Sequence, residues 1–72
     1  MRTRIHLVWD RREFGFLLVR GHTQYACVAF TPFGYVGTFS FKDTPTKLYK
    51  SFEAVAKECE KITQEWFFDN EF

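Results

Sequence analysis

The residues that build metal sites, disulfide frameworks and phosphate loops are scarce in this chain of 72 residues, which has two cysteines, two histidines and four glycines. Cys27 and Cys59 lack the close pairing of a zinc site, and the isolated glycines form no phosphate-binding loop. No apolar run is long enough to span a membrane, and the first residues lack the apolar segment of a signal peptide. These absences predict a non-enzymatic cytoplasmic protein without catalytic site, cofactor or metal, whose two thiols are unpaired.

An excess of charge of one sign is also lacking, because the net charge is only +1. A total this small disfavours both an acidic mimic of DNA and a strongly basic domain that binds nucleic acid nonspecifically. The charges are nevertheless segregated. Residues 1–50 carry eight Lys and Arg against three Asp and Glu, a net +5, and residues 51–72 carry two against six, a net −4.

Aromatic side chains are abundant instead: they make up 21% of the chain, and ten of them are Phe. A domain of this length buries only about 60% of the surface that its unfolded chain exposes. We therefore expect several rings to stay exposed and to form a binding surface. The rings expected in the core are Phe14, Phe16, Tyr25, Phe39, Phe41, Phe52 and Trp66. The rings expected outside it include Trp9, Phe30, Phe33, Phe67, Phe68 and Phe72.

Turn residues divide the first fifty residues into segments with the alternating pattern of strands. Asp10, Arg11 and Arg12 are interpreted as a charged turn that ends the first strand. The predicted strands span residues 4–9, 13–20, 24–30 and 35–42. Connections this short force neighbouring strands to run antiparallel, so we expect a three- to four-stranded antiparallel meander.

Residues 51–67 follow the helical period, with apolar residues recurring every three or four positions. Ser51 is a suitable N-cap, and Pro45 prevents the preceding strand from continuing. Residues 68–72 lack periodicity and are expected to form an aromatic tail. The sequence thus predicts a single α+β domain over residues 1–72, in which a C-terminal amphipathic helix packs on one face of the antiparallel sheet.

Neither face of the predicted sheet is polar, although one helix covers only one face. In the third strand, strict alternation places Tyr25 with Cys27 and opposite Ala26. We expect the face with the smaller side chains to stay open and to carry an apolar patch that binds a partner or closes a homodimer. On the fourth strand, this open face would carry Val36, Thr38 and Ser40.

The pentapeptide Phe33-Gly34-Tyr35-Val36-Gly37, followed by residues 50–56 (KSFEAVA), resembles in its placement the WGR domain, which binds DNA ends. Phe33 stands where that motif has Trp, and Tyr35 where it has Arg, the residue type that contacts phosphate. The resemblance implies an alternative function, a nucleic-acid-binding module that uses its basic, aromatic sheet half. The candidate phosphate contacts are Arg2, Arg4, Arg11, Arg12 and Arg20.

In its size, its architecture and its lack of a catalytic set, the chain resembles the small virus-encoded inhibitors of host machinery, such as anti-CRISPR proteins and phage inhibitors of host polymerases. This resemblance implies a protein of the host cytoplasm that occupies a surface of a partner protein or ribonucleoprotein and so inhibits host defence or transcription. Aromatic residues and Arg dominate such interfaces. The candidate partner-binding residues are therefore Trp9, Arg11, Arg12, Phe33, Phe67, Phe68 and Phe72. A second alternative is an adaptor subunit that self-associates through the open sheet face.

Overall fold

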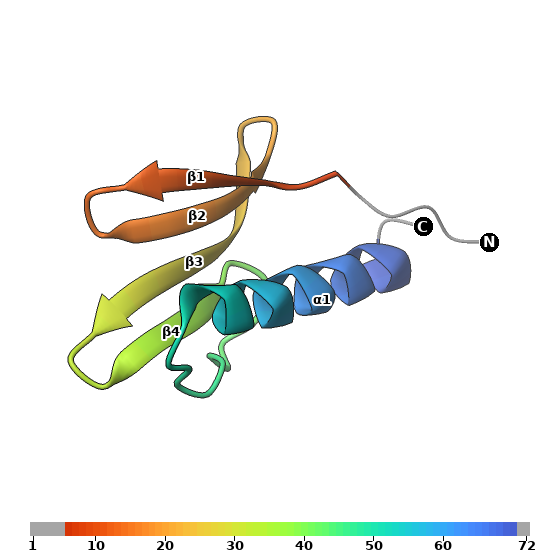
Figure 1. The fold of residues 1–72 in the computed structure, drawn as a ribbon. Coiled ribbons are helices and arrows are strands. Elements are labelled where there is room, and N and C mark those ends of the chain that lie inside the picture. Colours follow the sequence, from red (N-terminus) through yellow and green to blue (C-terminus); the bar gives the residue numbers. More distant parts are fainter. Residues whose placement is uncertain (1–5, 71–72) are drawn as a thin grey trace.

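The computed structural model describes residues 6–70, and within that range the chain forms four strands and one helix (Figure 1). The elements are β1 (Val8–Arg12), β2 (Gly15–Arg20), β3 (Thr23–Thr31), β4 (Gly34–Phe39) and α1 (Phe52–Asn70). The sheet order is β1-β2-β3-β4, and every neighbouring pair is antiparallel. The predicted α+β meander with a C-terminal helix is confirmed. No helix in the described range is long and apolar enough to cross a membrane.

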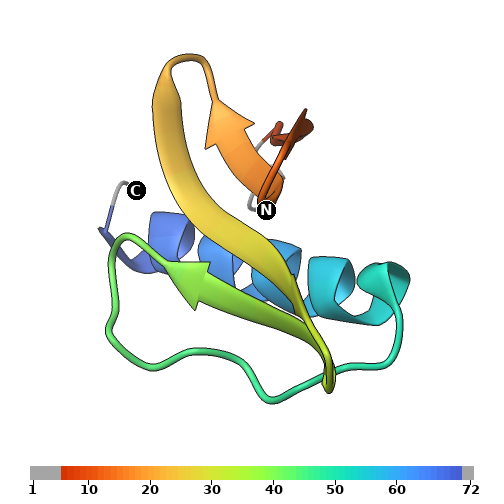
Figure 2. The same ribbon diagram turned by 90° about the vertical axis from the view of Figure 1, so that its left-hand side faces the viewer.

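Helix α1 packs along one face of the sheet, closest to β3 and β4 (Figure 2). The sheet contributes Leu18, Ala26 and Val28 to the core, and the helix contributes Val55 and Cys59, all of them buried. Because α1 lies nearest to β3 and β4, the hairpin of β1 and β2 extends beyond the helix axis, and its contact with the helix depends on a few large side chains.

Gly37 allows the helix to approach β4 closely. A Cβ atom at this position would collide with Sγ of Cys59 on α1. The residues two positions away on either side, Tyr35 and Phe39, pack against the core from the same face of the strand. The glycine is therefore a packing requirement, since any side chain there would push the helix away from the sheet.

The first strand lies later in the chain than predicted. Residues 10–12 belong to β1, and Arg12 pairs with Gly15, so the connection to β2 is the two-residue turn Glu13-Phe14. The interpretation of these charged residues as a turn was wrong, because β1 is an edge strand, where charged side chains reach water while the backbone stays paired. The start of the predicted strand falls in residues 1–5, outside the described residues.

A β-bulge interrupts the pairing of β2 with β3. Leu18 pairs with Ala26 but Val19 pairs with Gln24, so Tyr25 is an extra residue on β3. The side chain of a bulged residue does not point to the face that strict alternation along the strand would give it. The prediction that Tyr25 faces away from Ala26 was therefore wrong. The expectation that its ring lies between the sheet and the helix is confirmed, because the ring packs against α1. The rings of α1 that it contacts are those of Trp66 and Phe67.

Helix α1 begins as predicted and ends later. The backbone N–H of Ala54 donates to Oγ of Ser51 at 3.3 Å, which confirms the N-cap. The helix continues to Asn70, because the buried stripe continues: Phe67 follows Thr63 by one turn, and the two residues are 2% and 0% exposed. The expectation of an aperiodic tail from residue 68 was therefore wrong for residues 68–70, which are helical.

The segment between the sheet and the helix covers the outer edge of β4. Tyr35 and Tyr49 exchange two backbone hydrogen bonds of 2.7 and 2.8 Å, and the N–H of Thr46 donates to the Gly37 carbonyl at 2.8 Å. The chain must leave the sheet before the predicted residue 42 to make this return, which shortens β4. Of the two edge strands, β4 is therefore covered by its own chain.

Candidate functional site

Three phenylalanines at one end of the sheet are the most exposed aromatic residues in the described part of the chain. Phe14, Phe30 and Phe33 are 62%, 68% and 83% exposed. Phe14 lies in the turn between β1 and β2, Phe33 lies in the turn between β3 and β4, and Phe30 lies next to the end of β3. Both turns are at the same end of the sheet (Figure 1). We call these three residues the aromatic end.

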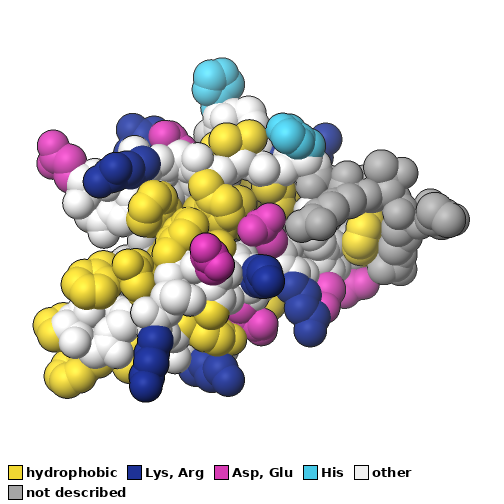
Figure 3. Space-filling model, in the orientation of Figure 1, with side chains coloured by type: hydrophobic (Ala, Val, Ile, Leu, Met, Phe, Trp, Pro, Cys, Tyr) yellow, Lys and Arg dark blue, Asp and Glu magenta, His cyan; other side chains and the backbone are white. Residues whose placement is uncertain are grey.

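Ring contacts connect Phe30, one residue of the aromatic end, to the core. The ring centroids of Phe30 and Tyr35 are 5.0 Å apart, those of Tyr35 and Phe52 are 6.4 Å apart, and those of Phe52 and Phe16 are 4.3 Å apart. Because α1 starts at Phe52, no part of the helix covers the sheet beyond that ring. Apolar side chains gather at the β3–β4 side of this end, and others lie near the centre of the molecule (Figure 3).

The turn that carries Phe33 is held by one side chain. Oγ1 of Thr31 accepts a hydrogen bond from the Phe33 N–H at 3.1 Å and donates one to the Gly34 carbonyl at 2.9 Å. Gly34 has a φ of 136°, a value that L side chains rarely adopt. The exposed ring thus projects from a backbone whose conformation is fixed in advance.

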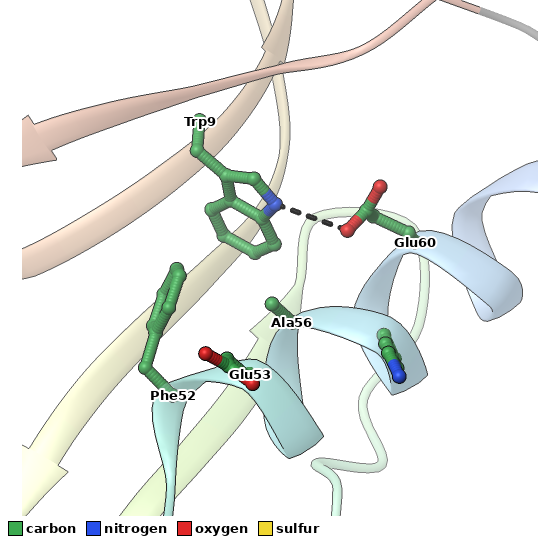
Figure 4. A pocket seen from close by; sticks show the side chains of 6 residues that line it. Trp9, Phe52, Glu53, Ala56 and Glu60 are labelled. Carbon is green, nitrogen blue, oxygen red and sulfur yellow. Dashed lines mark hydrogen bonds between the residues drawn. The ribbon is translucent and has the colours of Figure 1, made fainter.

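A groove separates β1 from α1, and we call it the Trp9 groove (Figure 4). The rings of Trp9 and Phe52 meet edge to face, with centroids 5.3 Å apart and planes at 73°. Nε1 of Trp9 donates to Oε2 of Glu60 at 3.3 Å. The groove has a volume of about 290 Å³. Its lining consists of Trp9, Phe52, Glu53, Ala56, Lys57 and Glu60.

The aromatic residues that the sequence nominated for partner binding differ in their exposure to solvent. Phe33 is exposed, and Trp9 is half-buried at the groove. Phe67 is only 2% exposed, so its nomination as a surface residue was wrong, because its ring completes the buried stripe of α1. Phe68 is half-buried, and Phe72 lies outside the described residues.

The basic residues nominated for partner or nucleic-acid binding do not gather on one face. Arg11 and Arg12 are neighbours in β1 and so point to opposite faces of the sheet. Arg12 pairs with Asp10 at 2.7 Å. The guanidinium of Arg20 lies over the Phe67 ring, 5.4 Å from its centroid, in the half of the sheet away from the aromatic end. Arg2 and Arg4 lie outside the described residues.

The face of the sheet away from α1 carries small and aliphatic side chains. The pairings of Ala29 with Val36 and of Cys27 with Thr38 place these residues there, which agrees with the predicted open side of β4. Ser40 lies just beyond the strand, where its Oγ donates to the Gln24 carbonyl at 3.0 Å. This face lacks large aromatic rings among the described residues, so the exposed aromatic surface is at the end of the sheet.

Both cysteines are free, as predicted, and neither suits nucleophilic chemistry. Burial raises the pKa of the Cys59 thiol to about 12, with a further contribution from the charge of Glu58. Burial also raises the pKa of Cys27. Within residues 6–70, no three His, Cys, Asp or Glu side chains come together as a metal site requires.

Sequence reasoning did not nominate Phe14, Phe30 or Glu60 for partner binding, although it expected Phe30 to lie outside the core. Phe14 was placed in the core, because the first strand was ended too early. Had β1 been extended to Arg12, Phe14 would have fallen in a two-residue turn, where a side chain is exposed. No local signal identifies Glu60, because its partner Trp9 is 51 residues away.

Neither a protein-family model, nor a curated protein, nor a solved structure matches this chain. Its function has to be inferred from the geometry of the surfaces described above.

Proposed function

We propose that this protein is a small non-enzymatic binding protein that occupies a surface of a partner protein or protein complex. The observation that carries the proposal is the aromatic end, where Phe14, Phe30 and Phe33 are each more than 60% exposed. Contiguous apolar patches on a soluble protein mark interaction sites, and aromatic anchors supply much of the energy of protein interfaces.

The size of the patch fits this role. Three phenylalanines at these exposures present on the order of 400 Å² of apolar surface, within the range of functional patches on monomers. Burying that area is worth about 10 kcal/mol before the costs of association, which are of similar size. A stable interface needs about 800 Å² on each partner, so we expect the contact to extend from the aromatic end onto the Trp9 groove.

The mode of action that follows is occupation of a surface, as in the small virus-encoded inhibitors that the chain resembles in size and architecture. A protein that blocks a phage host's defence or transcription machinery needs only a rigid surface of the correct shape. The hydrogen bonds of Thr31 and the ring contacts of Tyr35 and Phe52 support such rigidity.

The proposal is tested by affinity capture from a lysate of the native host cells, with and without nuclease, followed by calorimetric titration of the purified partner. We compare the wild-type chain with the double variant Phe30→Ser, Phe33→Ser. The matched control is Val8→Ser, which alters a 49% exposed apolar residue of β1 away from the aromatic end. Thermal unfolding of each variant and light scattering of the wild type accompany the assay.

We expect the double variant to lose at least tenfold in affinity and the control to keep the wild-type value. Equal affinity of the double variant would refute the role of the aromatic end. Loss of the captured partner on nuclease treatment would instead favour the nucleic-acid alternative. A stable dimer that the double variant dissolves would favour the self-associating adaptor.

A further inference from the structure

The two edges of the sheet differ, because β4 is paired with its own chain, whereas no segment within residues 6–70 pairs with the outer edge of β1 (Figure 1). We infer that this edge receives an extended segment of the partner protein, which adds a strand to the sheet and places an acidic side chain opposite Arg11. The inference rests on the proposed function and specifies the chemistry of one part of that interface.

The pairing of β1 with β2 determines which backbone groups of β1 point outward. Arg12 pairs with Gly15 across a two-residue turn, and the residues that flank such a turn exchange backbone hydrogen bonds. Because hydrogen-bonded and non-hydrogen-bonded pairs alternate along an antiparallel ladder, the N–H and C=O groups of Trp9 and Arg11 point away from β2. An extended segment beside β1 satisfies these donors and acceptors, as in other complexes formed by strand addition.

The side chains of β1 determine the charge that the added strand needs. Arg11 is exposed and pairs with Phe16, whose ring contacts Phe52, so its side chain points to the face of the sheet that carries α1. Asp10 forms an ion pair with Arg12 on the other face, and no carboxylate of the described residues pairs with Arg11. An acidic residue directly opposite Arg11 stabilises the strand pair, whereas a basic residue there destabilises it.

The edge of β1 connects the two parts of the proposed interface. One end of the strand leads into the turn that carries Phe14, a residue of the aromatic end, and Trp9 near the other end lines the Trp9 groove. The aromatic end offers on the order of 400 Å², about half of what a stable interface needs on each partner. A strand added along β1 supplies further contact area between these two surfaces.

A second copy of the chain is a poorer occupant of this edge. The antiparallel register that pairs all five residues of β1 with those of another copy places Asp10 opposite Asp10. Like charges directly opposite each other destabilise a strand pair. The charged side chains of residues 10–12 also disfavour pairing with an apolar strand, which is a common protection of edge strands. Pairing at this edge therefore requires a segment of complementary charge.

The test uses the ¹⁵N-labelled full-length chain at low salt and a capped seven-residue peptide in which Val and Thr alternate on either side of a central Glu. The matched probes carry Gln or Lys in place of Glu. The readout is the NMR signals of the outward backbone N–H groups of Trp9 and Arg11, compared with that of Asp10, which pairs with Leu17. We expect a saturable shift of the outward groups with the Glu peptide in the millimolar range, and a smaller shift of Asp10. Binding of the Gln peptide should be about twofold to fivefold weaker, and binding of the Lys peptide weaker still.

Variants of Arg11 separate the role of its backbone from that of its charge. Arg11→Pro removes the outward N–H at a position where an edge strand tolerates proline, so we expect no saturable shift of the Trp9 signal. Arg11→Glu keeps the N–H and should reverse the preference from the Glu peptide to the Lys peptide. The matched control, Lys50→Glu, makes the same change of charge beside Tyr49 at the covered edge of β4 and should keep the wild-type preference. Thermal unfolding shows whether each variant is folded, and the charge reversal at Arg11 decides the test if the proline variant is not.

The inference is overturned if no peptide gives a saturable shift, if a folded Arg11→Pro variant binds the Glu peptide as the wild type does, or if Arg11→Glu and Lys50→Glu have the same preference. A dimer in light scattering that Arg11→Pro dissolves would likewise overturn it and identify a second copy as the occupant. Failure of this titration leaves the capture assay with the Phe30 and Phe33 double variant unaffected, so the two proposals can fail separately.

Discussion

The indole of Trp9 on β1 and the carboxylate of Glu60 on α1 are joined by a hydrogen bond of 3.3 Å, although 51 positions separate them in the chain. Helix α1 packs mainly on β3 and β4, so this bond and the contact of Trp9 with Phe52 tie the edge hairpin to the helix. The same side chains also form the walls of the Trp9 groove. The contact that stabilises the hairpin thus also shapes a candidate binding site.

Breaking this hydrogen bond should measurably uncouple β1 from α1. In a double-mutant cycle of Trp9→Phe and Glu60→Ala, we expect a coupling free energy of about 1 kcal/mol, because one side of the bond is charged but the pair is only half-buried. Urea unfolding of the four proteins measures it. Strictly additive losses would show that the hydrogen bond does not contribute to the stability of the hairpin.

Removing the buried hydroxyl of Thr63 should stabilise the protein. Thr63 is 0% exposed, and its Oγ1 has no hydrogen-bond partner among the described residues. Thr63→Val replaces the hydroxyl with a methyl group of similar volume, so we expect the free energy of unfolding to rise by about 1 kcal/mol. Thr63→Ser, which keeps the hydroxyl and loses the methyl group, should instead destabilise the protein by about 1 kcal/mol. A stability of Thr63→Val below wild type would contradict the burial of an unpaired hydroxyl.

Phe33 and Phe67 should respond to truncation in opposite ways. Phe33→Ala removes an 83% exposed ring and should change the free energy of unfolding by no more than about 0.5 kcal/mol. Phe67→Ala removes a ring that is 2% exposed and should cost about 3–5 kcal/mol. Thermal and urea unfolding measure both effects. A similar loss in the free energy of unfolding for the two variants would mean that both rings have similar surroundings, which would contradict the structure.

Raising the pH above 9 should destabilise the protein through Cys59. Burial, with the charges of Glu58, Cys27 and Glu60 adding to it, raises the pKa of this thiol from 9.0 to about 12. The unfolded chain therefore releases the proton at lower pH than the folded protein. The contribution of the thiol to stability is complete below pH 9 and is lost as the pH rises toward 12, at up to about 1.4 kcal/mol per pH unit.

Comparison with Cys59→Ala isolates this effect from the titration of Lys and Tyr. We expect the difference in the free energy of unfolding between wild type and Cys59→Ala to shrink by about 1–2 kcal/mol between about pH 8 and about pH 10.5. Urea unfolding across this range measures it. A difference that does not vary with pH would mean that the thiol titrates alike in both states.

Much of the architecture follows from local patterns in the sequence. The period of two, the short turns and the antiparallel pairing they force predict the meander, and the stripe of apolar residues behind Ser51 predicts the helix and its first residue. The ends of the elements were less accessible. Residues 10–12 look like a turn because they are charged, and only their pairing with β2 shows that they form an edge strand.

The candidate site was predicted in part. Phe33 follows from its place in a turn, and Trp9 was nominated for its residue type. Phe67 was assigned to the surface because the predicted apolar stripe of the helix ended at Trp66, one residue too soon. Phe14 was assigned to the core because its turn was placed too early. Both errors arise at the ends of elements. There, one more paired residue or one more helical turn decides whether a side chain is exposed or buried.

The sequence by itself determined that this protein has more aromatic rings than so small a domain can bury, since the buried fraction of the surface depends on chain length. The place of Phe33 in a turn already indicated its exposure, but the burial of Phe67 and the exposure of Phe14 were decided only by the tertiary structure. The bulge at Tyr25 turns one ring toward the helix, and the start of α1 at Phe52 leaves the end of the sheet uncovered. Both outcomes depend on strand register and on the position of the helix along the sheet, which are set by packing between residues far apart in the chain.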